Sequence, residues 1–249
     1  MTEPPRPYEQ APPPPDGPPQ YAPPPQPYGP PPAYYRPLEA RLLAVKVVLW
    51  LTVAVTAFAV VSDLLEIALL NRMIAGEAVS DSDADNNDMR QALVGGLQLL
   101  LLIAAAVVFI MWLFRAYQNS DAVAPGVRRY GHGWAIGGWF VPIMNLWRPK
   151  QVVNDVWRAG GPPPEPNGVV QGWWALWLFS SIIGNFAGRS GFSSDTPEDI
   201  RSGTYAYLVS DLTAIPAAIL AIVMAATLTR RLNERAAQGP PGSADAPPR

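Results

Sequence analysis

Four long apolar segments constrain this chain more than any other feature of its sequence. They occupy residues 42–62, 92–114, 169–188 and 205–228. Each is long enough to cross a bilayer as a helix, which needs roughly 20 predominantly apolar residues. Backbone polar groups inside lipid must be paired within the protein, and a helix pairs them within its own segment. The sequence therefore predicts an all-α membrane protein with four transmembrane helices.

Lysine and arginine residues indicate how the four spans are oriented. If the N-terminus is cytoplasmic, fourteen of these residues lie on the cytoplasmic side and four on the outer side. Positive charge concentrates on the cytoplasmic side of membrane proteins. We therefore expect a multi-pass protein of the cell membrane with both termini in the cytoplasm.

Proline divides the chain into a membrane domain and two tails. Most of the 30 prolines lie in residues 1–37 and 236–249, where few aliphatic residues are available to form a core. We predict that both tails are disordered and that residues 38–235 form the membrane domain. Tyr21 and Tyr28 each begin a Tyr-(Ala/Gly)-Pro-Pro-Pro repeat. This pattern favours polyproline II and suits docking to a cytoplasmic protein, or it serves only as a spacer.

Several kinds of chemistry have no support in the sequence. The chain has no cysteine and one histidine, which excludes disulfides, thiolate sites and multi-histidine metal sites. No phosphate-binding loop, nucleophile elbow or helical metal motif is present. The basic residues are spread along the membrane edge rather than gathered for nucleic acid. We expect no enzyme activity, no cofactor and no nucleic-acid partner.

An apolar connector joins the second and third spans. Its central sequence, WFVPIMNLWRP at residues 139–149, is too short to cross a membrane and contains two prolines. Such a segment is expected to be interfacial or re-entrant, and its tryptophans favour the interface. We predict an interfacial segment over residues 134–159. Its candidate motif comprises Trp139, Pro142, Asn145, Trp147, Arg148 and Pro149.

A short helix is predicted at the end of this connector. Pro149 suits a first helical position, and Gly160 with Gly161 suits a helix stop. Val152, Val153, Val156 and Trp157 would share one face that lies on lipid. Asp155 and Arg158 would form a surface ion pair, while Arg148, Lys150 and Arg158 would attract anionic lipids of the inner leaflet.

The two outer loops are expected to differ. Residues 71–91 are acidic and short of apolar side chains, which favours a flexible, solvated loop. The second outer loop contains Thr196, Pro197, Glu198 and Asp199. This order of cap, proline and early acids predicts the start of a helix.

Three acidic residues form the candidate polar site. Asp63 and Glu66 lie at the outer end of the first span, and Asp211 lies seven residues into the fourth. Because these spans run in opposite directions, both aspartates fall near the outer leaflet at similar depth. An acid within a membrane is costly and points to function. The pair could share a proton and bind a cation or basic ligand, or each could reach headgroup water or its neighbouring serine, Ser62 or Ser210.

Three stretches of the chain resemble a known family. They are FIMWLFRAYQN (residues 109–119), GWAIGGWFVPIMNLWRPKQVVNDVW (133–157) and GWWALWL (172–178). These resemble the bacterial membrane family described as domain of unknown function 4328, with the tryptophan, proline, asparagine and arginine frame of residues 139–149 as the most specific part. The resemblance covers roughly residues 40–230 and implies a multi-span bacterial membrane fold, without an activity or functional residues.

Two functions remain open from the sequence. The first is a non-enzymatic scaffold or interaction module that uses the proline-rich tail. The alternative is a small transporter or channel component that uses Asp63 and Asp211. The oligomeric state is left undetermined by the sequence.

Overall fold

The protein is helical throughout the part of the chain that is described. The computed structural model describes residues 34–161, 167–191 and 196–238, and every regular element there is a helix. This confirms the all-α prediction. The predicted tails lie outside the described residues, apart from residues 34–37 and 236–238. The four long helices are α1 (Glu39–Ile74), α2 (Asp81–Val123), α5 (Gly168–Gly191) and α6 (Pro197–Ala237).

Each long helix contains one of the four predicted apolar segments. Three of them, α1, α2 and α6, are long and apolar enough to cross a membrane. Their apolar stretches are largely exposed; Phe58 on α1 is 58% exposed and Leu100 on α2 is 66% exposed. Soluble proteins rarely expose such continuous apolar surfaces, so these helices are those of a membrane protein. Helix α5 carries the remaining predicted span, and its crossing stays a prediction.

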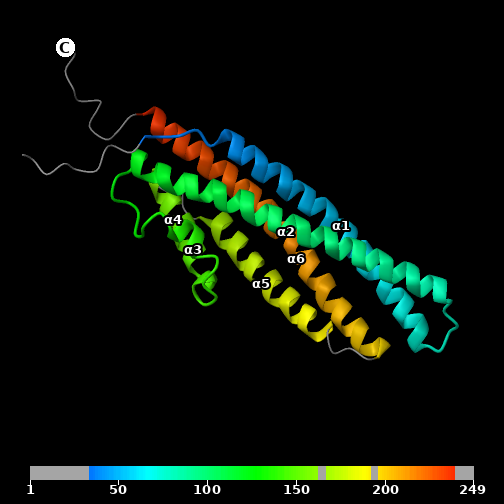
Figure 1. Cartoon of the computed structure of the whole chain (residues 1–249). Helices are drawn as coiled ribbons and strands as arrows, with labels where there is room; N and C mark the ends of the chain where they lie inside the picture. Colours follow the sequence, from blue (N-terminus) through cyan, green and yellow to red (C-terminus); the bar gives the residue numbers. More distant parts are fainter. Residues whose placement is uncertain (1–33, 162–166, 192–195, 239–249) are drawn as a thin grey trace, which may run out of the picture. The chain divides into compact units, whose positions relative to one another are not determined.

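The long helices pack in the order α5, α6, α1, α2 (Figure 1). Helix α6 contacts both α1 and α5, and α1 also contacts α2. Ala217, Ala221 and Ala225 of α6 are buried, and small residues at this spacing let helix backbones approach closely. A buried hydrogen bond from Trp112 Nε1 to Thr229 Oγ1, 3.1 Å long, also joins α2 to α6.

The α1–α2 turn corrects the prediction of a flexible loop over residues 71–91. Helix α1 continues to Ile74, and Gly76 follows it in the turn with a φ of +76°, which suits glycine. Helix α2 then begins at Asp81, where Ser80 Oγ accepts a hydrogen bond from the Asp83 amide. The acids of its first turn stabilise a helix N-terminus. The prediction took the acidic composition as a sign of a loop and overlooked this cap.

The start of α6 follows the predicted pattern. Helix α6 begins at Pro197, and Thr196 Oγ1 accepts a hydrogen bond from the Asp199 amide at 3.2 Å.

We call the end of the bundle that holds residues 75–80 the turn end, and the opposite end, which holds residues 124–161, the connector end.

Three short helices fold the connector against the bundle. They are α3 (Trp134–Gly137), the 3-10 helix η1 (Met144–Leu146) and α4 (Arg148–Ala159). The predicted helix after Trp147 is therefore present, with its proline in the first turn. Val152, Val153 and Val156 are fully buried in a cluster with side chains of α2 and α6. This apolar face thus packs on protein, whereas the sequence reading placed it on lipid.

Asp155 is the polar centre of the connector. Its side chain is completely buried. Oδ1 accepts hydrogen bonds from Arg129 Nε at 2.8 Å and from Arg158. Oδ2 lies 3.1 Å from both the Arg129 amide and Tyr117 Oη. The prediction of a surface pair between Asp155 and Arg158 is wrong in its location, because helical spacing does not show that residues 117 and 129 cover the aspartate.

Arg231 of α6 holds the end of α4 in place. Its Nη2 donates to the Gly161 carbonyl at 2.9 Å, and its guanidinium lies 4.7 Å from the Trp157 ring centroid. Positive charge at a helix C-terminus is stabilising. Gly160 permits this approach, because a Cβ there would lie 2.9 Å from Arg231 Cβ.

We predict that Gly160→Ala destabilises the protein by about 1–3 kcal/mol, because the added methyl group overpacks the contact with Arg231. The matched control is Gly137→Ala in the same connector, where no atom lies within 4 Å of the added Cβ. Thermal unfolding of the purified protein in detergent measures both variants. Equal midpoints for the two would contradict the proposed close packing of α4 and α6.

Candidate functional site

The polar site lies between α1, α2 and α6 near the turn end. Glu66 of α1, the acid of the site nearest the turn end, accepts hydrogen bonds from several side chains. Oε2 accepts from Gln91 Nε2 at 2.8 Å and lies 3.0 Å from Thr204 Oγ1, and Oε1 lies 3.4 Å from Asn87 Nδ2. These contacts bring the helical extension of α2 and the first turns of α6 to α1. Glu66 is therefore a satisfied carboxylate that ties three helices together.

Arg90 of α2 is held beside the acids by neutral groups. Its Nε donates to Ser62 Oγ at 2.9 Å, and its Nη2 donates to Asn87 Oδ1 at 2.5 Å. Arg90 forms no ion pair within 4.0 Å among the described residues. Its charge nevertheless attracts the nearby carboxylate of Asp63. Arg90 thus provides one positive charge to the site without neutralising an acid by direct contact.

Asp63 is the least satisfied group of the site. Its residue is only 6% exposed, and Oδ2 has no hydrogen-bond partner within the described chain. The carboxylates of Asp211 and Glu66 are close enough to repel it, while the charge of Arg90 and the side-chain amide of Gln91 favour it. A buried polar atom without a partner costs about 1–3 kcal/mol, and more when it is charged. The fold therefore retains an unfavourable carboxylate at this position.

Asp211 approaches the site from α6. It accepts a hydrogen bond from Gln98 Nε2 of α2 at 2.9 Å. The structure thus brings Asp63 and Asp211 within electrostatic range of each other, as the depth argument from the sequence required. Asp211 has a direct donor, whereas Asp63 Oδ2 has none, so the two members of the pair are not equivalent.

The acids form a row that leads into the bundle. Asp63 lies one helical turn deeper than Glu66, and Asp211 lies seven residues beyond Thr204, or about 10 Å along α6. No three His, Cys, Asp or Glu side chains in the described ranges are arranged to hold a metal ion. The site comprises the three carboxylates of Asp63, Glu66 and Asp211, with amide side chains and Arg90 as neighbours.

The adjacent serines do not satisfy these acids. Ser62 Oγ accepts from Arg90, and Ser210 Oγ donates to the Ser180 carbonyl of α5 at 3.0 Å. The alternative in which each aspartate bonds its neighbouring serine is thus absent. The tetrapeptide Val-Ser-Asp-Leu occurs at both 61–64 and 209–212, and its serine lies at a contact between helices in each case.

The candidate interfacial motif folds the connector. Trp139 packs edge-on against Phe109 of α2 and Trp177 of α5, with ring centroids 5.9 and 5.5 Å apart. The Arg148 guanidinium lies 4.0 Å from the ring centroid of Tyr130 and 4.8 Å from that of Trp134. Trp139 and Arg148 therefore contact protein groups. Pro149 is buried in the first turn of α4, and Trp147, 43% exposed, precedes that helix.

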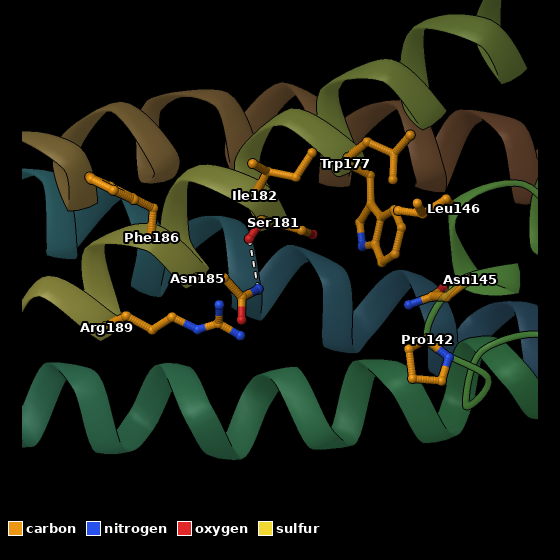
Figure 2. A pocket seen from close by; sticks show the side chains of 10 residues that line it. Pro142, Asn145, Leu146, Trp177, Ser181, Ile182, Asn185, Phe186 and Arg189 are labelled. Atoms are coloured by element: carbon orange, nitrogen blue, oxygen red, sulfur yellow. Dashed lines mark hydrogen bonds between the residues drawn. The ribbon is translucent and has the colours of Figure 1, made fainter.

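Pro142 and Asn145 line a groove between η1 and α5 (Figure 2). Its volume is about 540 Å³, and α5 contributes side chains from Trp177 to Arg189. Asn185 points along the groove and donates from Nδ2 to the Ser181 carbonyl at 2.7 Å. The groove is mainly apolar, and no carboxylate from the described part of the chain lines it. Its position beside exposed Phe140 and Ile143 continues the apolar surface of the connector.

The polar neighbours of the acids were missed by the sequence reading. They are Asn87, Arg90, Gln91, Gln98 and Thr204. The first three lie in the stretch taken for a flexible loop, so their helical faces were not considered. Spacing offered a usable signal, because residues 87, 91 and 98 recur at four and seven positions and share one side of a helix.

Comparison with known proteins gives a family without an assigned chemistry. The family described as Domain of unknown function (DUF4328) matches residues 75–230. The match starts at the turn after α1, later than the resemblance to residues 40–230 suggested. Gln98 and Asp211 lie inside it, and Asp63 and Glu66 lie outside it. No curated protein and no solved structure matches the chain.

We predict opposite effects of neutralising Asp63 and Glu66, the two acids that α1 contributes to the site. At alkaline pH, Asp63→Asn should stabilise the protein by roughly 1 kcal/mol, because it removes an unpartnered charge beside two carboxylates. Glu66→Gln should destabilise it by about 1–3 kcal/mol, because its carboxylate accepts hydrogen bonds from α2 and α6. Thermal unfolding in detergent compares the two variants. Destabilisation of equal size in both would refute the distinction between the two acids.

Proposed function

The chain belongs to the Domain of unknown function (DUF4328) family, and we propose that it is a small transporter or channel component that binds and releases a proton at Asp63 and Asp211. The observation that carries this proposal is Asp63 itself. The residue is 94% buried and its Oδ2 lacks a hydrogen-bond partner within the described residues. A membrane acid held in this way, beside a second acid, is typical of proton relays.

The charges around Asp63 favour a proton as the ligand. Three carboxylates and one guanidinium meet at this site, so full ionisation leaves an excess of two negative charges. Repulsion between close carboxylates is relieved when one of them takes up a proton. The bond from Gln98 gives Asp211 a donor in its charged form. The shared proton is therefore assigned to Asp63, with Asp211 as its ionised neighbour.

The row of polar groups supplies a route for the proton to the turn end. Glu66 lies one helical turn nearer that end than Asp63 does, and the amides of Asn87 and Gln91 contact its carboxylate. Toward the connector end, the same helices bury apolar groups such as Trp112 and Leu228. We propose that uptake and release occur on the turn-end side, which the positive-inside rule makes the outer side of the membrane.

We predict that vesicles containing the full-length protein take up or move protons when a pH gradient is applied. Asp63→Asn and Asp211→Asn should each reduce the rate to that of protein-free vesicles, because each removes one carboxylate of the pair. The change in internal pH, followed with a trapped fluorescent indicator, measures the rate. Asp85→Asn, which removes an exposed acid near the start of α2, is the matched control and should keep the native rate.

Two outcomes would end this proposal. One is a native protein that moves no more protons than empty vesicles do. The other is an Asp63→Asn variant as active as the Asp85→Asn control. Each variant is reconstituted in an equal amount of folded protein, checked by thermal unfolding. A lower rate then reflects the missing carboxylate and not a loss of structure.

A second candidate function is an interaction module that presents the proline-rich tail in the cytoplasm. Its support is the firm attachment of residues 35 and 38, where the tail meets the membrane domain, to the connector end. Leu38 is fully buried, and Tyr35 Oη donates to Asn233 of α6. Burial and the charge of Glu39 raise the pKa of Tyr35 to about 12, which keeps this donor protonated. The junction between the tail and α1 is therefore fixed to the bundle.

We predict that the tail and the turn end lie on opposite sides of the membrane. The chain has no cysteine, so Ala22→Cys and Ser82→Cys each introduce a single reporter. A membrane-impermeant maleimide should label Ser82→Cys in intact cells, and Ala22→Cys only in inside-out vesicles. Labelling of Ala22→Cys from outside would refute the orientation.

The module further requires residues 1–37 to bind a cytoplasmic protein better than a scrambled proline-rich control does.

A further inference from the structure

Three arginines at the connector end have no acidic partner. They are Arg36, which precedes α1, Arg41 in the first turn of α1, and Arg115 of α2. Other arginines at this end pair with carboxylates, as Arg128 does with Asp121. No ion pair within the described ranges includes residues 36, 41 or 115. The three positive charges thus lack a counter-charge from the described protein.

Contacts along α2 gather the three arginines on one face. Residues 111, 115 and 119 are four apart and so lie on the same side of that helix. Arg41 Nη1 donates to the Met111 carbonyl at 2.6 Å. The Asn119 side chain donates to the Arg36 carbonyl at 2.7 Å and accepts from the Arg36 amide at 3.1 Å. Arg41 and Arg36 therefore flank Arg115, one helical turn to either side.

The guanidinium of Arg115 lacks acceptors in this arrangement. Its Nε and Nη1 have no hydrogen-bond partner within the described residues. Burial, and then the charges of Arg41 and Arg36, lower the pKa of Arg115. Clustered guanidiniums repel one another unless an anion lies between them. An anion with several oxygens can accept hydrogen bonds from more than one of them.

The depth of the cluster points to a lipid as the source of this anion. Arg41 directly precedes the apolar segment 42–62, and Arg115 directly follows the segment 92–114. Because α1 and α2 run in opposite directions, both arginines lie at the same membrane edge. Leu43 is 62% exposed and Met111 is 50% exposed, which leaves apolar surface for an acyl chain directly beside the charges.

We propose that Arg36, Arg41 and Arg115 bind the phosphate of an anionic lipid headgroup at the connector end. The phosphate oxygens accept hydrogen bonds from the guanidiniums, and the acyl chains lie on the exposed apolar side chains of α1 and α2. This site is independent of the carboxylates at the turn end. It also differs from the connector arginines Arg148 and Arg158, which are engaged by aromatic rings and by Asp155.

Native mass spectrometry of the full-length protein in detergent tests this site. Phosphatidylglycerol, phosphatidylcholine and inorganic phosphate are titrated separately. The native protein should bind phosphatidylglycerol most tightly. Arg115→Gln should weaken that binding about fivefold, and Arg41→Gln with Arg115→Gln about twenty-five-fold, because each basic residue near anionic lipid contributes about one such step.

Matched variants decide whether the cluster or general charge is responsible. Arg230→Gln removes an exposed charge of α6 at the connector end and should keep the native affinity for phosphatidylglycerol. Arg115→Lys keeps the charge and should retain the preference for phosphatidylglycerol over phosphatidylcholine. Equal binding of the two lipids by the native protein would overturn the proposal, as would an equal loss in Arg230→Gln. Phosphate binding as tight as that of phosphatidylglycerol would show a free anion site in place of a lipid site.

Discussion

The structure depends on one constraint: polar groups placed between apolar helices must find their partners within the protein. Of two buried aspartates, one meets this constraint and the other does not. Asp155 receives hydrogen bonds on both oxygens from the α2 end and the loop that follows it. Asp63 keeps one oxygen without a partner and has acids as neighbours. The Asp155 carboxylate organises the fold, whereas the Asp63 carboxylate is the one whose unpaired charge a proton would remove.

The same contrast separates the two sets of residues that the sequence singled out. The residues 139–149 carry the most specific part of the family resemblance, and in the structure Trp139 and Arg148 contact rings of the protein. This frame is explained by the folding of the connector. The acids near the turn end carry no comparable motif, since Asp63 lies before the matched region. A strong sequence pattern and a strained polar group therefore occur in different parts of this molecule.

The apolar pattern was sufficient to predict the positions of the long helices, because lipid-facing segments must be continuous and helical. The order of cap residue, proline and early acids predicted the start of α6, where Thr196 caps the helix as expected. The apolar pattern gave less where partners come from distant residues. Valines 152, 153 and 156 were correctly grouped on one face, but periodicity does not reveal whether lipid or protein covers that face. Asp155 was placed at the surface for the same reason. The amide of Gln98 beside Asp211 depends on the packing of α2 against α6, which a single sequence does not specify.

Helix α6 is continuous from the turn end to the connector end, and Pro216 is the proline in its interior. It carries Asp211 in the half nearer the turn end and Arg231 at the point where α4 ends. These residues are twenty positions apart, or about 30 Å along a continuous helix. A tilt of α6 that accompanies a change of charge at Asp211 would act as a lever on α4. The base of the proline-rich tail, fixed to Asn233 of the same helix, would move with it, so that chemistry on one face of the membrane would be reported on the other.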